Sequence, residues 1–197
     1  MHVRVRKVLF IAVLCVMFAA CGELRFSRVA PDIGEFHPET ICVFPVNTGV
    51  YTQEAGDIAD DLIADVVRRK GIFSTVVSPE RVSKLMEQDD RLRDAVTGYL
   101  AKLRTVHFSD PDMARYIGTA IDVDALLVVD VDFWNYTTQG SDKLAKAGFS
   151  MNLIAAQTGE VMWKANHSDT KDYSWFKPDL AKFARGVAKE MISHMPH

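Results

Sequence analysis

The sequence predicts an α+β domain with a mixed β-sheet: two parallel-type strands, then a C-terminal antiparallel three-strand meander, all covered by helices. Two observations predict this class. Over 41–77 a strand, an amphipathic helix and a second strand follow one another, which favours parallel strands. Over 124–166 three strand-like segments follow closely, which favours an antiparallel meander. The length of 40–197 fits one domain.

The first half of this domain contains both parallel-type strands and four helices. The first strand is expected over 41–46, and Pro45 places it near an edge or ends it early. A helix over 57–70 begins with acidic residues, ends with Arg68-Arg69-Lys70 and is stopped by Gly71. The next elements expected are a strand over 72–77, a helix opened by Ser78 and Pro79, a short helix over 95–104 weakened by Gly98, and a helix from Ser109 to about Thr119.

The meander begins with a strand over 124–136 that is apolar on both faces at first and alternates from Asp130 on. We expect Val131 and Phe133 on one face and Asp130, Asp132 and Trp134 on the other. Strands over 148–156 and 161–166 follow, joined by a tight turn at Thr158-Gly159, and each presents one polar face. Pro178 opens a terminal helix with an apolar stripe, most simply explained as core: Leu180, Phe183, Val187 and Met191.

The N-terminus has the composition of a secretory signal peptide. Arg4, Arg6 and Lys7 precede the apolar residues Val8 to Ala20. This run is shorter than the roughly 20 residues that a membrane span needs. We therefore expect residues 1–20 to be a signal peptide. Its end, described next, favours a lipoprotein signal peptide, and an ordinary secretory signal or an uncleaved anchor is the alternative.

The end of this segment resembles the lipobox of bacterial lipoproteins, because Phe18-Ala19-Ala20 precedes Cys21. The resemblance implies that Cys21 carries a diacylglycerol and a further acyl chain such as palmitate, and that residues 21–39 are the lipidated cysteine and a short tether. Several acyl chains make membrane anchoring stable. Gly22 differs from the aspartate that retains such proteins in the inner membrane, so the resemblance implies outer-membrane delivery.

The body resembles a group of envelope lipoproteins over roughly residues 40–195. The resemblance rests on the strand that ends in a proline, on Asp124 to Val129, and on Thr158 to Trp163. The group includes the curli-assembly lipoprotein, the penicillin-binding-protein activator lipoproteins and small lipoproteins of the same kind. The resemblance implies that the domain is a non-enzymatic interaction module. The sequence offers no additional pair of alternating segments for a membrane-spanning pore, and the short tether differs from the long tethers of the activators.

The charge of the chain argues against one class of partner, and its three cysteines have separate expected roles. The formal net charge is −3, and the signal segment contributes basic residues only, so the body is acidic and a poor candidate for nucleic acid. Cys15 lies in the signal and Cys21 is the lipid candidate, which leaves Cys42 as a small buried hydrophobic residue.

Few residues suggest chemistry. The sequence has no phosphate-binding Gly-rich loop, no nucleophile elbow and no zinc-ligand spacing, so we expect no cofactor and no metal. Asp130 and Asp132 share a strand face and are weak candidates for a cation site or an acid/base pair. The simpler interpretation is a solvated strand face, with Lys164 as a cross-strand partner.

Aromatic residues are the main candidates for a partner surface, because aromatic side chains are enriched at interface anchors. They are Trp134, Tyr136, Tyr173, Trp175 and Phe176. Core packing is the alternative for each of them.

The sequence thus favours a lipid-anchored, periplasm-facing adaptor or assembly factor of the cell envelope that is not an enzyme. Its partners would be the membrane, through the lipid, and an envelope protein or further copies of itself. Two alternatives remain: a cell-wall or lipid-processing enzyme that uses Asp130 and Asp132, and a carrier of a small apolar ligand.

Overall fold

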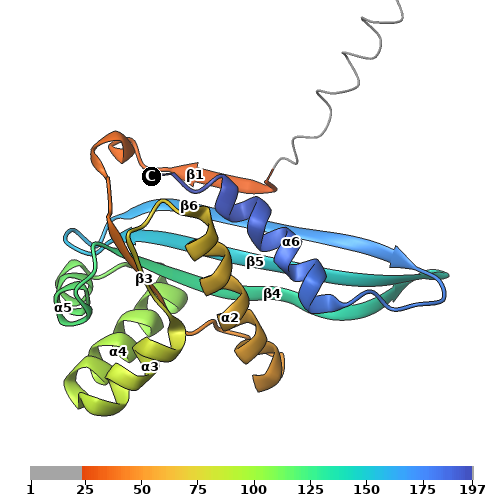
Figure 1. Ribbon diagram of the computed structural model, residues 1–197, viewed down its shortest axis with the longest axis horizontal. Coiled ribbons are helices and arrows are strands. Elements are labelled where there is room, and N and C mark those ends of the chain that lie inside the picture. The colour runs from red at the N-terminus through yellow and green to blue at the C-terminus, as the bar shows by residue number, and fades with distance from the viewer. Residues whose placement is uncertain (1–23, 197) are drawn as a thin grey trace, which may run out of the picture.

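The computed structural model describes residues 24–196. It contains a six-stranded sheet with the spatial order β1-β6-β5-β4-β2-β3 (Figure 1). Strand β2 is parallel to β3 and β4, whereas β4, β5, β6 and β1 are antiparallel neighbours. The predicted α+β class, with its parallel start and antiparallel meander, is therefore confirmed.

The elements have the following bounds. The strands are β1 Phe26–Val29, β2 Thr40–Val43, β3 Thr75–Val77, β4 Ala125–Gln139, β5 Asp142–Ala155 and β6 Val161–Tyr173. The helices are the 3₁₀ turn η1 Ile33–Glu35, α2 Gln53–Lys70, α3 Pro79–Gln88, α4 Asp90–Val106, α5 Pro111–Ile121 and α6 Leu180–Ser193. No helix among residues 24–196 has both the length and the apolar character that a membrane span requires.

Helices cover both faces of the sheet, so the core has two halves. On the α2/α6 face, residues such as Leu127, Phe149 and Trp163 pack against the apolar sides of those two helices. On the opposite α3–α5 face, Cys42 and Leu126 pack against α3, α4 and α5. Helix α3 contacts β2, and α5 contacts β4. Figure 1 shows α3, α4 and α5 gathered near β2 and β3, at one end of the long meander.

Local signals determine several helix ends. Ser78 caps α3 with Pro79 in its first turn, and Gly71 ends α2 in a left-handed conformation, both as predicted. Helix α5 was predicted from Ser109, and its N-cap is the next residue, Asp110. Helix α2 begins earlier than predicted, because Thr52 is its N-cap. Helix α4 is much longer than the predicted 95–104, because Asp89 accepts hydrogen bonds from the backbone N–H groups of Arg91 and Leu92.

The predicted faces of β4 are correct up to Asp132, which lines the same pocket as Asp130, but wrong at Trp134. The pairing of β4 with β5 shifts between Val131 and Phe133, as in a β-bulge. As a result Trp134 packs on the α2/α6 face, with its ring edge-to-face on Phe149 at 6.4 Å, and not on the side of Asp130 as predicted. One extra residue in a strand reverses the side of every residue that follows it.

Part of the predicted tether belongs to the sheet. Residues Phe26–Val29 form β1, which pairs with β6 at the sheet edge, and η1 follows it. Trp163 donates a hydrogen bond from Nε1 to Ser27 Oγ at 3.1 Å, which fastens β1 to the body. The prediction of a tether over 21–39 therefore extended too far along the chain. The lipidation site at Cys21 and the signal segment lie outside the described residues.

Candidate functional site

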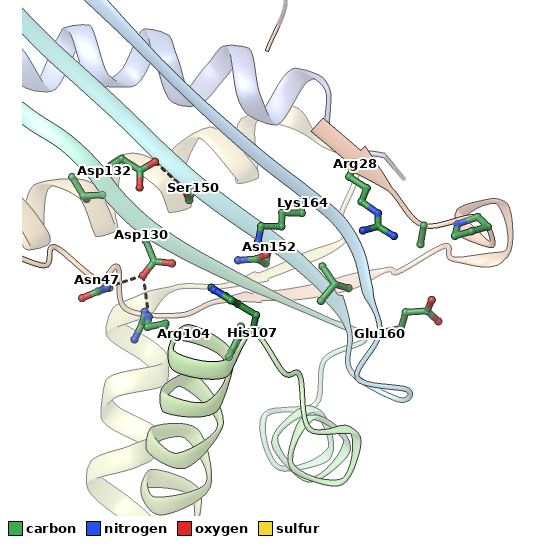
Figure 2. A pocket seen from close by; sticks show the side chains of 15 residues that line it. Arg28, Asn47, Arg104, His107, Asp130, Asp132, Ser150, Asn152, Glu160 and Lys164 are labelled. Atoms are coloured by element: carbon green, nitrogen blue, oxygen red, sulfur yellow. Dashed lines mark hydrogen bonds and ion pairs between the residues drawn. The ribbon is translucent and has the colours of Figure 1, made fainter. Parts of the chain in front are cut away.

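A polar pocket of about 660 Å³ lies on the α3–α5 face, beyond the area those helices cover. Its floor is formed by β4, β5 and β6. The end of α4 contributes Arg104 and His107, the segment after β2 contributes Asn47, and β1 contributes Arg28. Figure 2 shows these side chains around one hollow, with Asp130 and Glu160 toward opposite ends.

Two neighbouring rows of side chains cross the floor of this pocket. In the first row Asp130, Ser150 and Asn166 are register partners across β4, β5 and β6. In the second row Asn152, Lys164 and Arg28 are register partners across β5, β6 and β1. Alternation along each strand turns both rows to the same side. We call them the acidic row and the basic row.

Asp130 in the acidic row is paired on two sides. Its Oδ1 accepts a hydrogen bond from Asn47 Nδ2 at 2.7 Å and an ion-paired hydrogen bond from Arg104 Nε at 2.9 Å. The predicted cross-strand partner Lys164 is thus replaced by an arginine from α4. Arg104 Nη2 is buried and has no hydrogen-bond partner among the described residues.

Asp132, the second predicted carboxylate, lines the same pocket but has other partners. Its Oδ2 accepts hydrogen bonds from Ser150 Oγ at 2.8 Å and Asn166 Nδ2 at 2.7 Å. Burial raises the pKa of the Asp132 carboxyl, the charge of Asp130 adds to this, and the bonds from Ser150 and Asn166 oppose it. The two carboxylates therefore share a pocket without sharing a partner.

The segment that carries Asn47 is held in place by helix α2. The backbone N–H of Val46 donates to Asp60 Oδ1 at 2.7 Å, and the Asn47 N–H donates to the Val129 carbonyl at 3.1 Å. Burial raises the pKa of Asp60 to about 6; the bond from Val46 lowers it, and the charges of Asp57 and Asp61 raise it.

Replacing Asp60 with asparagine is expected to stabilise the protein near pH 7.5 by about 1 kcal/mol, a value reduced from the full linkage energy because the side chain is only half-buried. The folded protein binds the Asp60 proton more tightly than the unfolded chain does. The stability that this provides is present below pH 3.8 and is lost as the pH rises through about 6. Thermal unfolding at pH 4.5 and 7.5 measures this difference.

The matched control is Glu87→Gln, which removes an exposed carboxylate from α3. We expect Asp60→Asn to lose most of its advantage at pH 4.5, while Glu87→Gln shows no such trend. Equal pH profiles for the two variants would contradict the assignment.

The predicted aromatic residues fall into three environments. Trp134 is partly buried and packs against the core of the α2/α6 face. Tyr136 and Tyr173 support the segment between β6 and α6: their rings meet edge-to-face at 5.8 Å, and Tyr136 Oη donates to the Pro178 carbonyl at 2.7 Å. Lys177 Nζ lies 4.8 Å from the centre of the Tyr136 ring. Trp175 and Phe176 project from this segment and are 92% and 89% exposed.

Other candidates have simple roles or remain weak. Cys42 is fully buried as predicted, and burial raises the pKa of its thiol, so the residue acts as part of the core. Among residues 24–196, no group of three or more His, Cys, Asp or Glu side chains is placed to hold a metal ion. Asp130 and Asp132 remain a pair of carboxylates with protein partners.

Arg28, Asn47 and Arg104 were not recognised from the sequence as pocket residues. Arg28 lay in the predicted tether, and Arg104 at the end of a helix with no visible partner. Lys164, Ser150, Asn152 and Asn166 were predicted on polar strand faces, and they do share one face of the sheet.

The fold is shared with solved bacterial proteins. No protein-family model matches the sequence, and no curated protein matches it significantly. The PelC dodecamer from Paraburkholderia phytofirmans superposes with a TM-score of 0.54 at 17% identity over 85% of this chain and 93% of that one. Its L103M variant gives 0.54 at 19% identity, over 87% and 96%.

The lipoprotein GNA1162 from Neisseria meningitidis gives a TM-score of 0.53 at 14% identity, over 80% of this chain and all of that one. At these identities the likeness shows a common fold. The chain therefore has a fold that a bacterial lipoprotein also has, and none of these three structures is named as an enzyme.

Proposed function

We propose that this chain is a lipid-anchored, periplasm-facing adaptor of the bacterial cell envelope that works through protein–protein contacts and without catalysis. The observation that carries the proposal is the pair Trp175 and Phe176, which are almost fully exposed on a segment that the body holds in place. Large aromatic side chains held in the open are typical anchors of an interface, because their burial on binding costs little side-chain entropy.

The lipobox-like Cys21 supports the anchor, and the fold shared with GNA1162 supports a place among envelope lipoproteins. Gly22 after the cysteine supports the outer membrane. The finer relation, to the curli-assembly and penicillin-binding-protein activator lipoproteins, belongs to this proposal as well.

The partner that we favour is a second copy of the chain. The similar PelC structures are dodecamers, so this fold is compatible with assembly of many identical copies. In such an assembly Trp175 and Phe176 of one copy would pack on its neighbour.

Photo-crosslinking tests the adaptor surface. With a benzophenone amino acid at position 175 of the full-length protein in its membrane, we expect crosslinks to another copy or to one defined envelope protein. Position 50 is the control, because Val50 is 94% exposed and lies far along the chain from the aromatic segment. The double substitution Trp175→Ser and Phe176→Ser should abolish the assembly measured by native mass spectrometry and leave unfolding unchanged.

Identical products from positions 175 and 50 would indicate random collision and contradict the proposal. An assembly that survives the double substitution would also contradict it.

A further inference from the structure

We propose that the polar pocket binds a small molecule through a carboxylate or phosphate group, which Arg28 and Lys164 hold between them. This inference goes beyond the adaptor role and depends neither on Cys21 nor on Trp175. It rests on the contrast between the two rows of side chains on the pocket floor.

The acidic row and Asp132, which is bonded to it, have their hydrogen-bond partners within the protein. Asp130 accepts from Asn47 and Arg104, and Asp132 accepts from Ser150 and Asn166. Asn166 Nδ2 also lies 3.0 Å from Ser150 Oγ. A cation offered to this row would compete with donors already in place.

The basic row lies two residues along β5 and β6 from the acidic row, and its side chains lack hydrogen-bond partners among the described residues. Among residues 24–196, Arg28, Lys164 and Asn152 have no side-chain hydrogen bond or ion pair that meets normal geometry. Arg28 and Lys164 are direct register partners on adjacent antiparallel strands. Like charges directly opposite each other destabilise a sheet, so this pair costs stability unless an anion lies between them.

The surroundings favour a ligand with further polar groups. Figure 2 places Lys164 and Asn152 between Arg28 and His107, along one side of the hollow. Asn152 offers both a donor and an acceptor, and Arg104 Nη2 is a buried donor with no partner in the described part of the chain. Among residues 24–196, Glu160 is the lining carboxylate whose side chain has neither a hydrogen bond nor an ion pair, whereas Asp130 and Asp132 both have partners. Figure 2 places Glu160 toward the far end of the pocket from Asp130.

The size of the pocket fits a small molecule. Ligand pockets commonly measure about 300–1,000 Å³, and this one measures about 660 Å³. A planar guanidinium binds a carboxylate or phosphate through two parallel hydrogen bonds, and an ammonium adds a point charge. The occupant is therefore an anionic molecule with hydroxyl or amide groups near its charge.

Thermal unfolding of the full-length protein in detergent tests this inference with three probes: inorganic phosphate, glucuronate as a carboxylate and glucose as a neutral sugar. Sodium chloride of equal ionic strength accounts for screening. We expect phosphate, glucuronate or both to raise the unfolding temperature with a dissociation constant near or below about 1 mM, and glucose alone to have no effect. The stronger of the two anions identifies the ligand class.

Arg28→Gln and Lys164→Gln test the site itself. Both side chains are exposed, so both variants should fold, which circular dichroism verifies. We expect each to weaken anion binding at least tenfold. The controls Arg25→Gln and Lys171→Gln make the same charge changes outside the pocket lining and should bind as the unchanged protein does.

A second measurement needs no ligand. At low salt and without an anion, Lys164→Gln should unfold at the same or a higher temperature than the unchanged protein, because it removes a like-charge pair. Equal anion binding by all four variants, or no binding of either anion at 50 mM, would overturn the proposal. It would also fail if Lys164→Gln changed the mass of the assembly and left anion binding intact, since this face would then be a contact between copies.

Discussion

Replacing Trp163 with alanine is expected to lower the free energy of unfolding by about 3–5 kcal/mol, the range for large aromatic truncations in a core. Trp163 is fully buried and packs on the α2/α6 face with Leu153 and Ala165. Its indole N–H also donates to Ser27 of β1, so the substitution removes a side-chain contact that adds to the backbone pairing of β1 with β6. Denaturant unfolding followed by circular dichroism measures the loss.

Trp175→Ala is the matched control, because it removes the same side chain from a position that is 92% exposed. Surface substitutions of this kind change stability by less than about 0.5 kcal/mol. A similar loss for the two variants would show that the segment after β6 packs on the body and would contradict its proposed role as an open surface.

The comparison also separates stability from binding. Trp163→Ala should weaken the hold on β1 and with it the position of Arg28, so anion binding should fall even where the protein remains folded. Trp175→Ala should leave anion binding unchanged, since Trp175 does not line the pocket. This pair of results would show that the pocket and the aromatic segment act independently of each other.

Much of the fold could be predicted because its signals are local. Ser78 with Pro79 starts α3, Asp110 with Pro111 starts α5, and Gly71 ends α2, each through contacts within a few residues. The strand directions followed from the order of elements along the chain. Cys42 was assigned to the core from the apolar run around it, and it is fully buried.

The failures depend on contacts between distant segments. The amino-acid sequence of β4 does not indicate the bulge between Val131 and Phe133, because a bulge is defined only by how β4 pairs with β5. Strand β1 is short, with all four residues exposed, so it lacks the apolar alternation that reveals a buried strand. Its place at the sheet edge comes from β6, which lies well over a hundred residues later in the sequence.

Some of the residues that line the pocket could be predicted from the sequence. Alternation in β5 and β6 placed Ser150, Asn152 and Lys164 on polar faces, which the structure confirms. These residues became a candidate site only through two contacts between distant segments. Strand β1 places Arg28 opposite Lys164 in the basic row, and α4 places Arg104 against Asp130 in the acidic row. Pairing across the sheet decides which charges are satisfied within the protein and which remain for a ligand.

The position of β1 also shortens the connection to the proposed lipid. Four residues lie between Cys21 and Phe26, the first residue of β1, and the five residue steps that join them span at most about 17 Å. A tether through residue 39 would have allowed about 60 Å. The proposed anchor therefore holds the β1 edge, with Arg28 two residues further on, close to the membrane face.

Replacing Cys21 with alanine is expected to abolish incorporation of a labelled fatty acid into the protein entirely and to leave residues 1–20 uncleaved, because the proposed lipid is attached at that cysteine. Mass spectrometry of the purified chain measures both outcomes. Cys15→Ala is the control, since it changes a cysteine within the apolar segment and should leave acylation intact. Acylation that persists in Cys21→Ala would disprove the anchor and with it the membrane part of the proposed function.

A variant with twenty flexible residues inserted between Gly22 and Glu23 separates attachment from distance. It keeps Cys21 and should still be acylated, but its body is no longer confined near the membrane, where a short connection raises the local concentration of copies. We expect crosslinks from position 175 to weaken in this variant if the short connection contributes to assembly. Unchanged crosslinking would show that the lipid supplies location alone and that the aromatic segment is sufficient for the contact.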